Sequence, residues 1–397
     1  MDSHNTLDAI VIGAGSAGLS CAYKLDEGGA TFALISDTLG GRIDYDSTGK
    51  VNFGAYFVMS NYGNAAKLVS RRTRINPLSC RFHDGKGESF PTLSMHTLKR
   101  SPGFAAFGIA MAQFMRHYSQ FKKNCEVMSH REAMELDPFI LRLYTEPASS
   151  FIARHHLGSV AEDYVSKFSY ACTGADMDQI TALDFCNVSQ GLIVPIHRFE
   201  FDAEAHRKRL GERFVEDSVV AHREENGLHI VTTASGREFV GKTVVFATPA
   251  VVTAQFLDVG DIRQSCQLYV EHVRGTIRKD LSAQDMNLFP FTSPIIFTAV
   301  QDDGTYLVYS REPEIDLAAL FTQFELIQRR EWEKAMYVTG RAYVEQQYGP
   351  TTFVAGDHNG LGLEPTAISG IYAANQILNA VGLHANKFLT ASANNEK

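Results

Sequence analysis

The sequence predicts an α/β protein of two domains, each assembled from separate stretches of the chain. Three observations carry this prediction. The N-terminal sixty residues alternate strand, glycine-rich turn, helix and strand, which is a βαβ opening. From about 62 to 190 the apolar residues recur at the three- and four-residue spacing of helices. Strand signals return from about 191, and the C-terminal stretch again reads strand, turn and helix.

The first two strands and the helix between them follow directly from residue types. Ala9–Ile12 is a short apolar run, and 31–35 is rich in β-branched and aromatic residues, so both are expected as strands. Leu19–Leu25 has helical spacing, and the pair Gly28-Gly29 would end that helix.

The turn between them is a G-x-G-x-x-G motif, which predicts a dinucleotide site in this context. Gly13 allows the tight turn, Gly15 lets the backbone approach a pyrophosphate, and Gly18 lets the helix pack on the strand. The N–H groups around Ser16 and Ala17 would then face the anion. An acid about 20 residues on should hold the adenosine ribose, and Asp37 is the candidate, with Ser36 as the alternative.

Later elements are predicted by strand runs and turn signals. We expect strands at 218–221, 229–233 and 239–246, and a hairpin of 295–300 and 306–309 about the turn Asp302-Asp303-Gly304. The segment 317–332 is expected to be helical. A strand at 352–355, a Gly356-Asp357 turn and a helix from about Ala367 complete the chain.

Composition narrows the class of protein. The chain has 397 residues, enough for two to three domains, with 45% apolar and 21% charged residues, as in soluble globular proteins. A net charge of −8 argues against a broad nucleic-acid surface. Its six cysteines lack metal-ligand spacing, so no metal is expected, and they fit reduced thiols in a cytoplasm. The apolar stretch 103–115 is too short to span a membrane, so no integral segment is expected; it suits a buried or amphipathic helix, or a peripheral membrane contact.

Four further segments carry a family resemblance. Gly40-Gly41-Arg42 after the second strand, Asn52-Phe53-Gly54-Ala55, the run 244–249 ending in Ala-Thr-Pro, and the segments 352–357 and 364–370 stand in one order along the chain. Together they resemble the superfamily of flavin amine oxidases, protoporphyrinogen oxidases and phytoene desaturases, which bind FAD. The resemblance implies a Rossmann-type, three-layer FAD domain like that of glutathione reductase, with a second mixed α+β substrate domain.

The resemblance also implies roles for particular residues. Arg42, after Gly41, would offer its guanidinium fork to the pyrophosphate. Gly356 would let the backbone approach the cofactor, and Asp357 would accept hydrogen bonds from the ribityl hydroxyls. The helix near Thr366 would point its N-terminus at the flavin. The remaining cofactor contacts implied are Gly54, Ala55, Val219, Thr248 and Glu364.

The expected activity is a flavin-dependent oxidoreductase that moves a hydride from an amine-like C–N bond or a C–C bond of a small organic molecule to flavin N5. Reoxidation would be by oxygen or another acceptor. His358 and Tyr56 are the candidate catalytic side chains; the alternative for His358 is a loop residue that faces solvent, and Tyr56, two residues after Gly54, is an equally open candidate. No cysteine follows Cys266, so the FAD is expected to be non-covalent. The other readings are a desaturase or isomerase of a biosynthetic pathway, and a non-catalytic FAD-binding partner protein.

These patterns predict an FAD domain from 1–61, 191–250 and 341–397, and a substrate domain from 62–190 and 251–340. The substrate, the acceptor and the oligomeric state are not fixed by the sequence.

Overall fold

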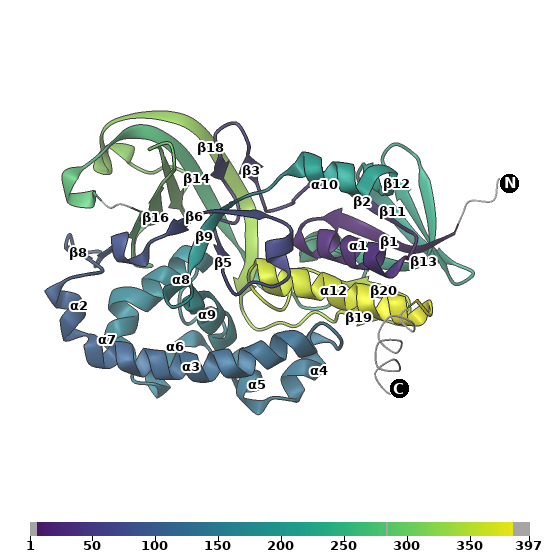
Figure 1. Cartoon of the computed structure of the whole chain (residues 1–397), viewed down its shortest axis with the longest axis horizontal. Coiled ribbons are helices and arrows are strands. Elements are labelled where there is room, and N and C mark those ends of the chain that lie inside the picture. Colours follow the sequence, from purple (N-terminus) through teal and green to yellow (C-terminus); the bar gives the residue numbers. More distant parts are fainter. Residues whose placement is uncertain (1–5, 283–284, 384–397) are drawn as a thin grey trace, which may run out of the picture.

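A computed structural model of the chain describes residues 6–282 and 285–383. Two large sheets dominate it (Figure 1), one on each side of the molecule, with helices packed against both. The mixed α/β architecture predicted from the sequence is confirmed.

The first sheet contains the predicted βαβ opening. Its strands follow the order β10-β2-β1-β13-β12-β11, with β20 added to β13 and β19 added to β20. β1 lies between β2 and β13 and is parallel to both, and all four of its central residues are buried, which explains its continuous apolar run. The bounds are β1 Leu7–Ala14, β2 Phe32–Leu39, β10 Phe214–Glu216, β11 Val219–Glu225, β12 Leu228–Thr233, β13 Glu238–Phe246, β19 Gln347–Tyr348 and β20 Thr352–Val354.

Two helices that are far apart in sequence pack together on this sheet. α1 (Ser16–Gly28) and α12 (Leu363–Ala380) lie side by side in Figure 1. A Cβ atom at Gly370 would stand 2.0 Å from the carbonyl oxygen of Ala17, so only glycine permits this contact. α1 ends at Gly29 in the left-handed conformation, φ 79°, as the Gly28-Gly29 pair predicted. The short helices α10 (Ala203–Leu210) and α11 (Ala250–Thr253) complete this side.

The second sheet has the order β18-β14-β17-β16-β15-β7-β8. The predicted hairpin is confirmed, because β16 pairs antiparallel with β17. The helical part of the predicted insertion lies below this sheet in Figure 1. The strands are β7 Cys80–His83, β8 Ser89–Pro91, β14 Gln264–Ile277, β15 Met286–Leu288, β16 Ile295–Val300, β17 Tyr306–Ser310 and β18 Phe321–Thr339. The helices are α2 Met95–Lys99, α3 Ser101–Asn124, α4 His130–Glu135, α5 Pro138–Thr145, α6 Ala148–Arg154, α7 Gly158–Val160, α8 Ser166–Thr173 and α9 Ala182–Ser189.

Two secondary-structure predictions are wrong. The segment 317–332 is not a helix: after a short turn it forms β18, a 19-residue strand paired with β14 from Ile277 to Gln264. Its charged residues favour a helix only locally, and pairing with a long partner strand overrides that preference. The insertion is also less helical than predicted, because 70–91 supplies β6, β7 and β8 before the helices begin.

The strands divide between the sheets along the predicted domain boundaries. Every strand of the first sheet comes from 1–61, 191–250 or 341–397, and every strand of the second from 62–190 or 251–340. A small sheet of β5 (Val58–Met59), β9 (Ile196–Glu200) and β6 (Ser70–Ile75) joins the two sides, and β3 (Tyr45–Asp46) pairs with β4 (Val51–Asn52). The sheets support the two-domain division, which stays a proposal.

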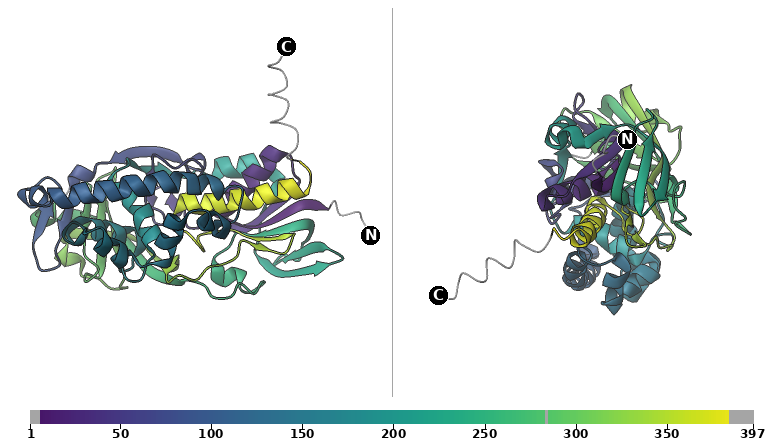
Figure 2. Two further views of the ribbon diagram at one scale, coloured as in Figure 1. Left: turned by 90° about the horizontal axis from the view of Figure 1, so that it is seen from below. Right: turned by 90° about the vertical axis from the view of Figure 1, so that its right-hand side faces the viewer.

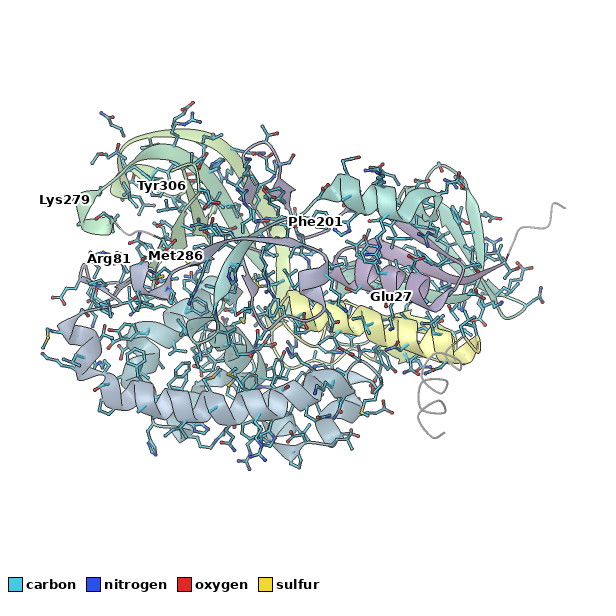
Figure 3. All side chains as sticks on the ribbon, in the orientation of Figure 1. Glu27, Arg81, Phe201, Lys279, Met286 and Tyr306 are labelled. Carbon is cyan, nitrogen blue, oxygen red and sulfur yellow. The ribbon has the colours of Figure 1, made fainter. Side chains whose placement is uncertain are left out.

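Figure 3 shows the side chains that fill the molecule. Phe201 lies where the chain passes between the two sides, and its ring would meet a Cβ atom at Gly40 at 2.9 Å. Lys279 lies at the outer end of the second sheet. No helix among the described residues is both long and apolar enough to cross a membrane.

Candidate functional site

The start of α1 is an open anion-binding terminus. The first intrahelical bond runs from the Leu19 N–H to the Gly15 carbonyl, so the N–H groups of residues 16–18 have no partner within the helix. No side chain caps this end, and no acidic residue lies in its first turn. The Ser16 hydroxyl donates to the Leu363 carbonyl at 3.2 Å, which holds the start of α12 beside the start of α1. Two positive helix termini therefore converge on one place.

Two glycines of the motif are required by the protein itself. Gly13 has φ 99°, and a Cβ atom there would stand 2.5 Å from the Ala247 carbonyl oxygen. A Cβ atom at Gly18 would stand 1.8 Å from the Gly13 carbonyl oxygen. These are the tight turn and the close helix–strand packing that the sequence predicted.

The middle glycine is different, because nothing in the protein requires it. Gly15 has φ −75° and ψ −168°, an extended conformation open to any residue. The nearest heavy atom to a Cβ atom there is the Gly40 carbonyl oxygen, at 3.9 Å. A side chain at Gly15 would occupy the space in front of the two helix termini, which is where a bound pyrophosphate needs room.

The Gly-Gly-Arg loop lies across this turn. Gly41 adopts φ 56°, and a Cβ atom there would be 3.1 Å from the Gly15 Cα. Arg42 is directed at Asp357: its Nη1 and Nη2 donate to the two carboxylate oxygens, both at 2.7 Å. Arg42 also donates to the Ala335 carbonyl at 3.1 Å. The groups predicted for the pyrophosphate and for the ribityl chain thus form one bidentate pair.

The pairing of Arg42 with Asp357 determines the ionisation state of the Asp357 carboxyl group. Burial would raise the pKa of Asp357, but the charge and hydrogen bonds of Arg42 outweigh it, and the pKa is lowered. The Asp357 side chain is 7% exposed and that of Arg42 is 29% exposed. The carboxylate is therefore ionised, and the Arg42 side chain is the more exposed partner of the pair.

His358 lies next to Asp357 and has unused hydrogen-bonding capacity. It is 4% exposed, and neither ring nitrogen has a hydrogen-bond partner of good geometry in the described part of the chain. Burial lowers the pKa of His358, with Asp357 opposing and Arg42 reinforcing the shift, so the imidazole is neutral at pH 7. The buried Tyr337 hydroxyl is likewise unpartnered by geometry, and the Arg42 guanidinium carbon is 6.0 Å from the Tyr337 ring centroid. Buried polar groups of this kind are normally satisfied, so they fit a bound polar molecule.

Most of the other predicted cofactor residues lie beside the glycine turn or beside the Arg42–Asp357 pair. The Ala55 N–H donates to the Arg42 carbonyl at 3.0 Å, and a Cβ atom at Gly54 would clash with that carbonyl at 2.0 Å. The Thr248 methyl group lies against Gly13. Gly356, at φ 155°, is held by the Ser369 hydroxyl, which accepts its N–H at 2.9 Å.

Ser36 and Asp37 lie near the end of β2, beside the glycine turn, because Ile35 and Leu39 pair with Ile12 and Ala14 of β1. β2 continues past the predicted end to Leu39, and the Asp217 N–H donates to the Ser36 carbonyl at 3.1 Å, two residues before Val219. Asp37 is exposed, and Ser36 is partly buried. The structure leaves the choice between Ser36 and Asp37 open.

Two predicted cofactor residues are already engaged by the protein. The Glu364 carboxylate accepts the backbone N–H groups of Gly63, Asn64 and Ala65 at 2.8–3.1 Å and is 3% exposed. The Thr366 hydroxyl donates to the Gly362 carbonyl at 2.8 Å. Glu364 thus ties the segment after β5 to α12, a role that no sequence pattern indicated.

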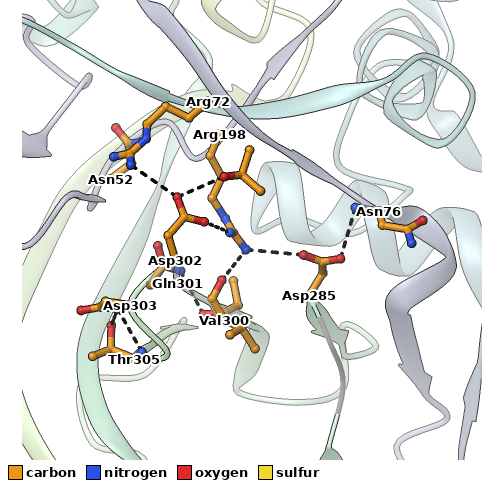
Figure 4. A network of polar contacts seen from close by, with 12 residues as sticks. Asn52, Arg72, Asn76, Arg198, Asp285, Val300, Gln301, Asp302, Asp303 and Thr305 are labelled. Atoms are coloured by element: carbon orange, nitrogen blue, oxygen red, sulfur yellow. Dashed lines mark hydrogen bonds and ion pairs between the residues drawn. The ribbon is translucent and has the colours of Figure 1, made fainter.

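Tyr56 contacts a buried polar network centred on Arg198, whose contacts with Asp302 and Asp285 are shown in Figure 4. Its hydroxyl accepts hydrogen bonds from Arg198 at 3.2 Å and Gln301 at 3.4 Å. Arg198 also donates to Asp302 at 2.6 Å and lies 3.6 Å from Asp285. This network closes the hairpin turn of β16 and β17 onto β9, and within the described residues no hydrogen bond or ion pair joins Tyr56 or Arg198 to Arg42 or Asp357.

A second buried network was missed by the sequence analysis. Arg263 and Asp184 form an ion pair of 2.7 Å, with side chains 0% and 2% exposed. The other oxygen of Asp184 accepts the Leu361 N–H at 3.0 Å. The pair therefore fixes the loop that follows Asp357 and His358. Nothing in the sequence brings Asp184 and Arg263 together, because they are 79 residues apart.

The comparisons with known proteins agree with this geometry. Residues 8–49 match the family model of the FAD binding domain. The match includes the Gly13–Gly18 turn, so the cofactor predicted from the sequence, FAD, is supported independently. No curated protein matches the chain.

Solved structures confirm the fold. A double mutant of putrescine oxidase superposes with a TM-score of 0.68 at 13% identity, covering 94% of this chain and 99% of that one. A conjugated-linoleic-acid-producing fatty acid isomerase from P. acnes gives 0.66 at 13% identity, covering 94% and 98%. Cyclohexylamine oxidase from Brevibacterium oxydans IH-35A gives 0.64 at 13% identity, covering 95% and 98%. The resemblance to flavin amine-oxidase-like proteins that the motifs indicated is confirmed at the level of fold.

Proposed function

We propose that this chain, which has the fold of the flavin amine oxidases, is an FAD-dependent oxidoreductase that acts on a small organic molecule. The proposal extends to hydride removal from a carbon beside nitrogen, or from a carbon–carbon bond. FAD, when bound, would supply the hydride acceptor at its N5. The chain's own residues would bind the cofactor, orient the substrate and exclude water.

One observation carries the proposal: position 15 is glycine although neither its backbone conformation nor the surrounding protein atoms require one. Its backbone is ordinary and its Cβ position is open, yet it stands before two convergent helix termini. A ligand with a close-lying diphosphate explains it, and the family match at 8–49 names FAD.

The residues present fit that cofactor. The N-termini of α1 and α12 would bind the diphosphate, with Arg42 adding its positive charge nearby. Asp357 keeps a lone pair for a hydroxyl group, since an ionised carboxylate accepts about four hydrogen bonds, of which Arg42 uses two and the Tyr337 N–H, at 3.4 Å, a third. Among the catalytic candidates, His358 is the better supported, because its imidazole is neutral and its ring nitrogens have no hydrogen-bond partner of good geometry beside this pair. A neutral imidazole there can accept a proton from the substrate or hydrogen-bond the cofactor. Tyr56 stays a weaker candidate, because its hydroxyl is already used in the core.

Binding of the cofactor is tested first. The purified protein should be yellow, and acid should release the chromophore intact. Gly15→Val should leave the thermal unfolding of the FAD-free protein nearly unchanged but abolish reconstitution with FAD. Unchanged FAD affinity in Gly15→Val, or a wild-type protein that refuses FAD under gentle reconstitution, would refute the proposal.

Catalysis is tested by anaerobic mixing with primary and secondary amines and, separately, with unsaturated fatty acids. The second class is included because the fatty acid isomerase superposes as well as the amine oxidases do. Loss of the yellow absorbance together with an imine or aldehyde product supports amine oxidation. An isomerised or desaturated product favours the second activity. A flavoprotein reduced by neither, and turning over neither, would point to a non-catalytic role. In His358→Ala, an unchanged rate of flavin reduction would remove that residue from the mechanism.

A further inference from the structure

The most exposed apolar side chains in the described part of the chain gather in one short stretch. Ile109, Leu93 and Met95 are 74%, 69% and 68% exposed, and Leu98 is 61% exposed. They lie just before α2, on α2 and in the first half of α3, within 17 residues of sequence. Large apolar side chains concentrated in this way on a surface mark a contact with something apolar.

The longer segment that contains this stretch is basic, in contrast to the rest of the chain. Residues 89–125 contain five Lys or Arg and no Asp or Glu, whereas the whole chain has a net charge of −8. Arg100 is paired with Asp163 across the domain. Lys99, Arg116 and Lys123 are exposed and enter no ion pair among the described residues, so their charges are available to a partner.

Apolar and basic groups share one stripe of α3. Ile109, Arg116 and Lys123 are seven residues apart in turn, so they lie on the same side of the helix with about 20° of drift per step. Two small exposed residues share this stripe, Ala105 four residues before Ile109 and Ala112 three residues after it. The opposite side of α3 is buried, through residues such as Phe107 and Phe114. Figure 2 shows α3 running along the outside of the molecule, seen from below.

We propose that this α2–α3 face, defined by Leu93, Met95, Leu98 and Ile109 with Lys99, Arg116 and Lys123, binds to an anionic phospholipid surface. Apolar side chains would enter the headgroup boundary while the cations stay at the phosphate level. The positive charge of the face favours an anionic lipid surface over a second copy of the chain. A two-fold contact through the face would set Arg116 and Lys123 among their own copies, so like charges would meet without a counter-ion.

The proposal is independent of the cofactor and of the reaction. It implies that the protein docks on a membrane without crossing it. The apolar side of α3 packs inside the protein, so the contact would be made by the exposed side chains of the face alone.

Flotation with extruded vesicles tests it, using the full chain. Vesicles of phosphatidylcholine with a quarter of phosphatidylglycerol should carry the protein upward, and vesicles of phosphatidylcholine alone should carry much less. The triple variant Leu93→Ser, Met95→Ser and Leu98→Ser should lower the partition coefficient at least tenfold. The triple variant Lys99→Gln, Arg116→Gln and Lys123→Gln should remove the preference for phosphatidylglycerol and the sensitivity to salt.

A matched control uses exposed apolar residues outside the face. Leu136 and Val220 are 64% and 58% exposed, and the double variant Leu136→Ser and Val220→Ser should partition as the wild type does. Circular dichroism and the unfolding midpoint establish that each variant is folded. Absence of wild-type binding to the anionic vesicles, or an equal loss in the control, would overturn the proposal. A dimer in sedimentation that the apolar triple variant abolishes would assign the face to a second copy and would also overturn it.

Discussion

Removing the charge of Asp184 should destabilise the protein strongly, because it leaves the Arg263 guanidinium buried without a counter-ion. Arg263 is 0% exposed, and its Nε already has no hydrogen-bond partner. Besides the ion pair, Asp184 accepts from the Thr181 hydroxyl at 2.9 Å and from the Leu361 N–H at 3.0 Å. Breaking a buried pair of this kind costs about 3–5 kcal/mol in the free energy of unfolding.

A double-mutant cycle separates two quantities: the free-energy cost of leaving Arg263 buried without its partner, and the net contribution of the ion pair to the free energy of unfolding. Asp184→Leu should lower the free energy of unfolding in urea by about 3–5 kcal/mol. Asp184→Leu combined with Arg263→Met removes both charges and should recover most of that loss, since the two side chains are in direct contact and their effects are not additive. A single variant that loses less than about 1 kcal/mol, or a double variant as unstable as the sum of the singles, would refute this reasoning.

The same cycle has a functional readout. Asp184 holds the loop containing Asn359 and Leu361, which directly follows the Asp357 and His358 pair. We therefore expect Asp184→Leu to weaken FAD binding in protein that is still folded, measured by fluorescence on titration with free FAD. The double variant should bind FAD more tightly than the single one. Equal affinities for wild type and Asp184→Leu would mean that the loop does not depend on the ion pair.

Three further changes have outcomes that follow from single contacts. Gly18→Ala forces a Cβ atom to 1.8 Å from a backbone oxygen and should cost about 1–3 kcal/mol, whereas Gly158→Ala, with open space around it, should change stability by less than about 1 kcal/mol in thermal unfolding. Glu364→Gln replaces a carboxylate that accepts three backbone N–H groups and should cost about 1.5–3 kcal/mol in urea unfolding; a neutral result would mean that the amide serves equally well. Pairing with Arg42 outweighs burial and lowers the pKa of Asp357 in the folded state. The contribution of this carboxylate to the free energy of unfolding is therefore present above its unfolded pKa of about 3.9 and is lost as the pH falls. The difference in stability between wild type and Asp357→Asn should thus be largest near neutral pH and shrink below about pH 4; a difference that grows in acid contradicts this.

Local patterns predicted the first sheet well. The strand, turn, helix and strand from Leu7 to Leu39 follow from a buried apolar run, a glycine turn and a glycine stop, all contained within 33 residues. The hairpin at 295–310 was predicted for the same reason, because its turn residues lie between two runs rich in β-branched and aromatic residues. Where a signal is short-range, the sequence is sufficient.

Local sequence patterns did not predict the features that depend on contacts between distant parts of the chain. The segment of β18 carries Glu, Gln, Arg and Lys at spacings that a helix tolerates, and only its partner β14 makes it a strand. Glu364 was expected to touch a cofactor but instead binds the backbone 300 residues away. Arg42 and Asp357 were each predicted for the site, yet their direct pairing was not, because it depends on how two loops 315 residues apart meet.

The placement of α12 constrains the order in which the molecule can be completed during synthesis. β20 and α12 belong to the last part of the described chain, yet β20 joins β13 in the first sheet and α12 packs on α1. A ribosome-bound chain lacking residues after 350 already has β1, β2, β13 and α1, but β13 lacks β20 and α1 lacks α12. The helices from 95 to 190 pack largely on one another, as α5 and α6 do on α9, and they can form sooner. The first sheet therefore contains the first strands of the described chain but is completed last.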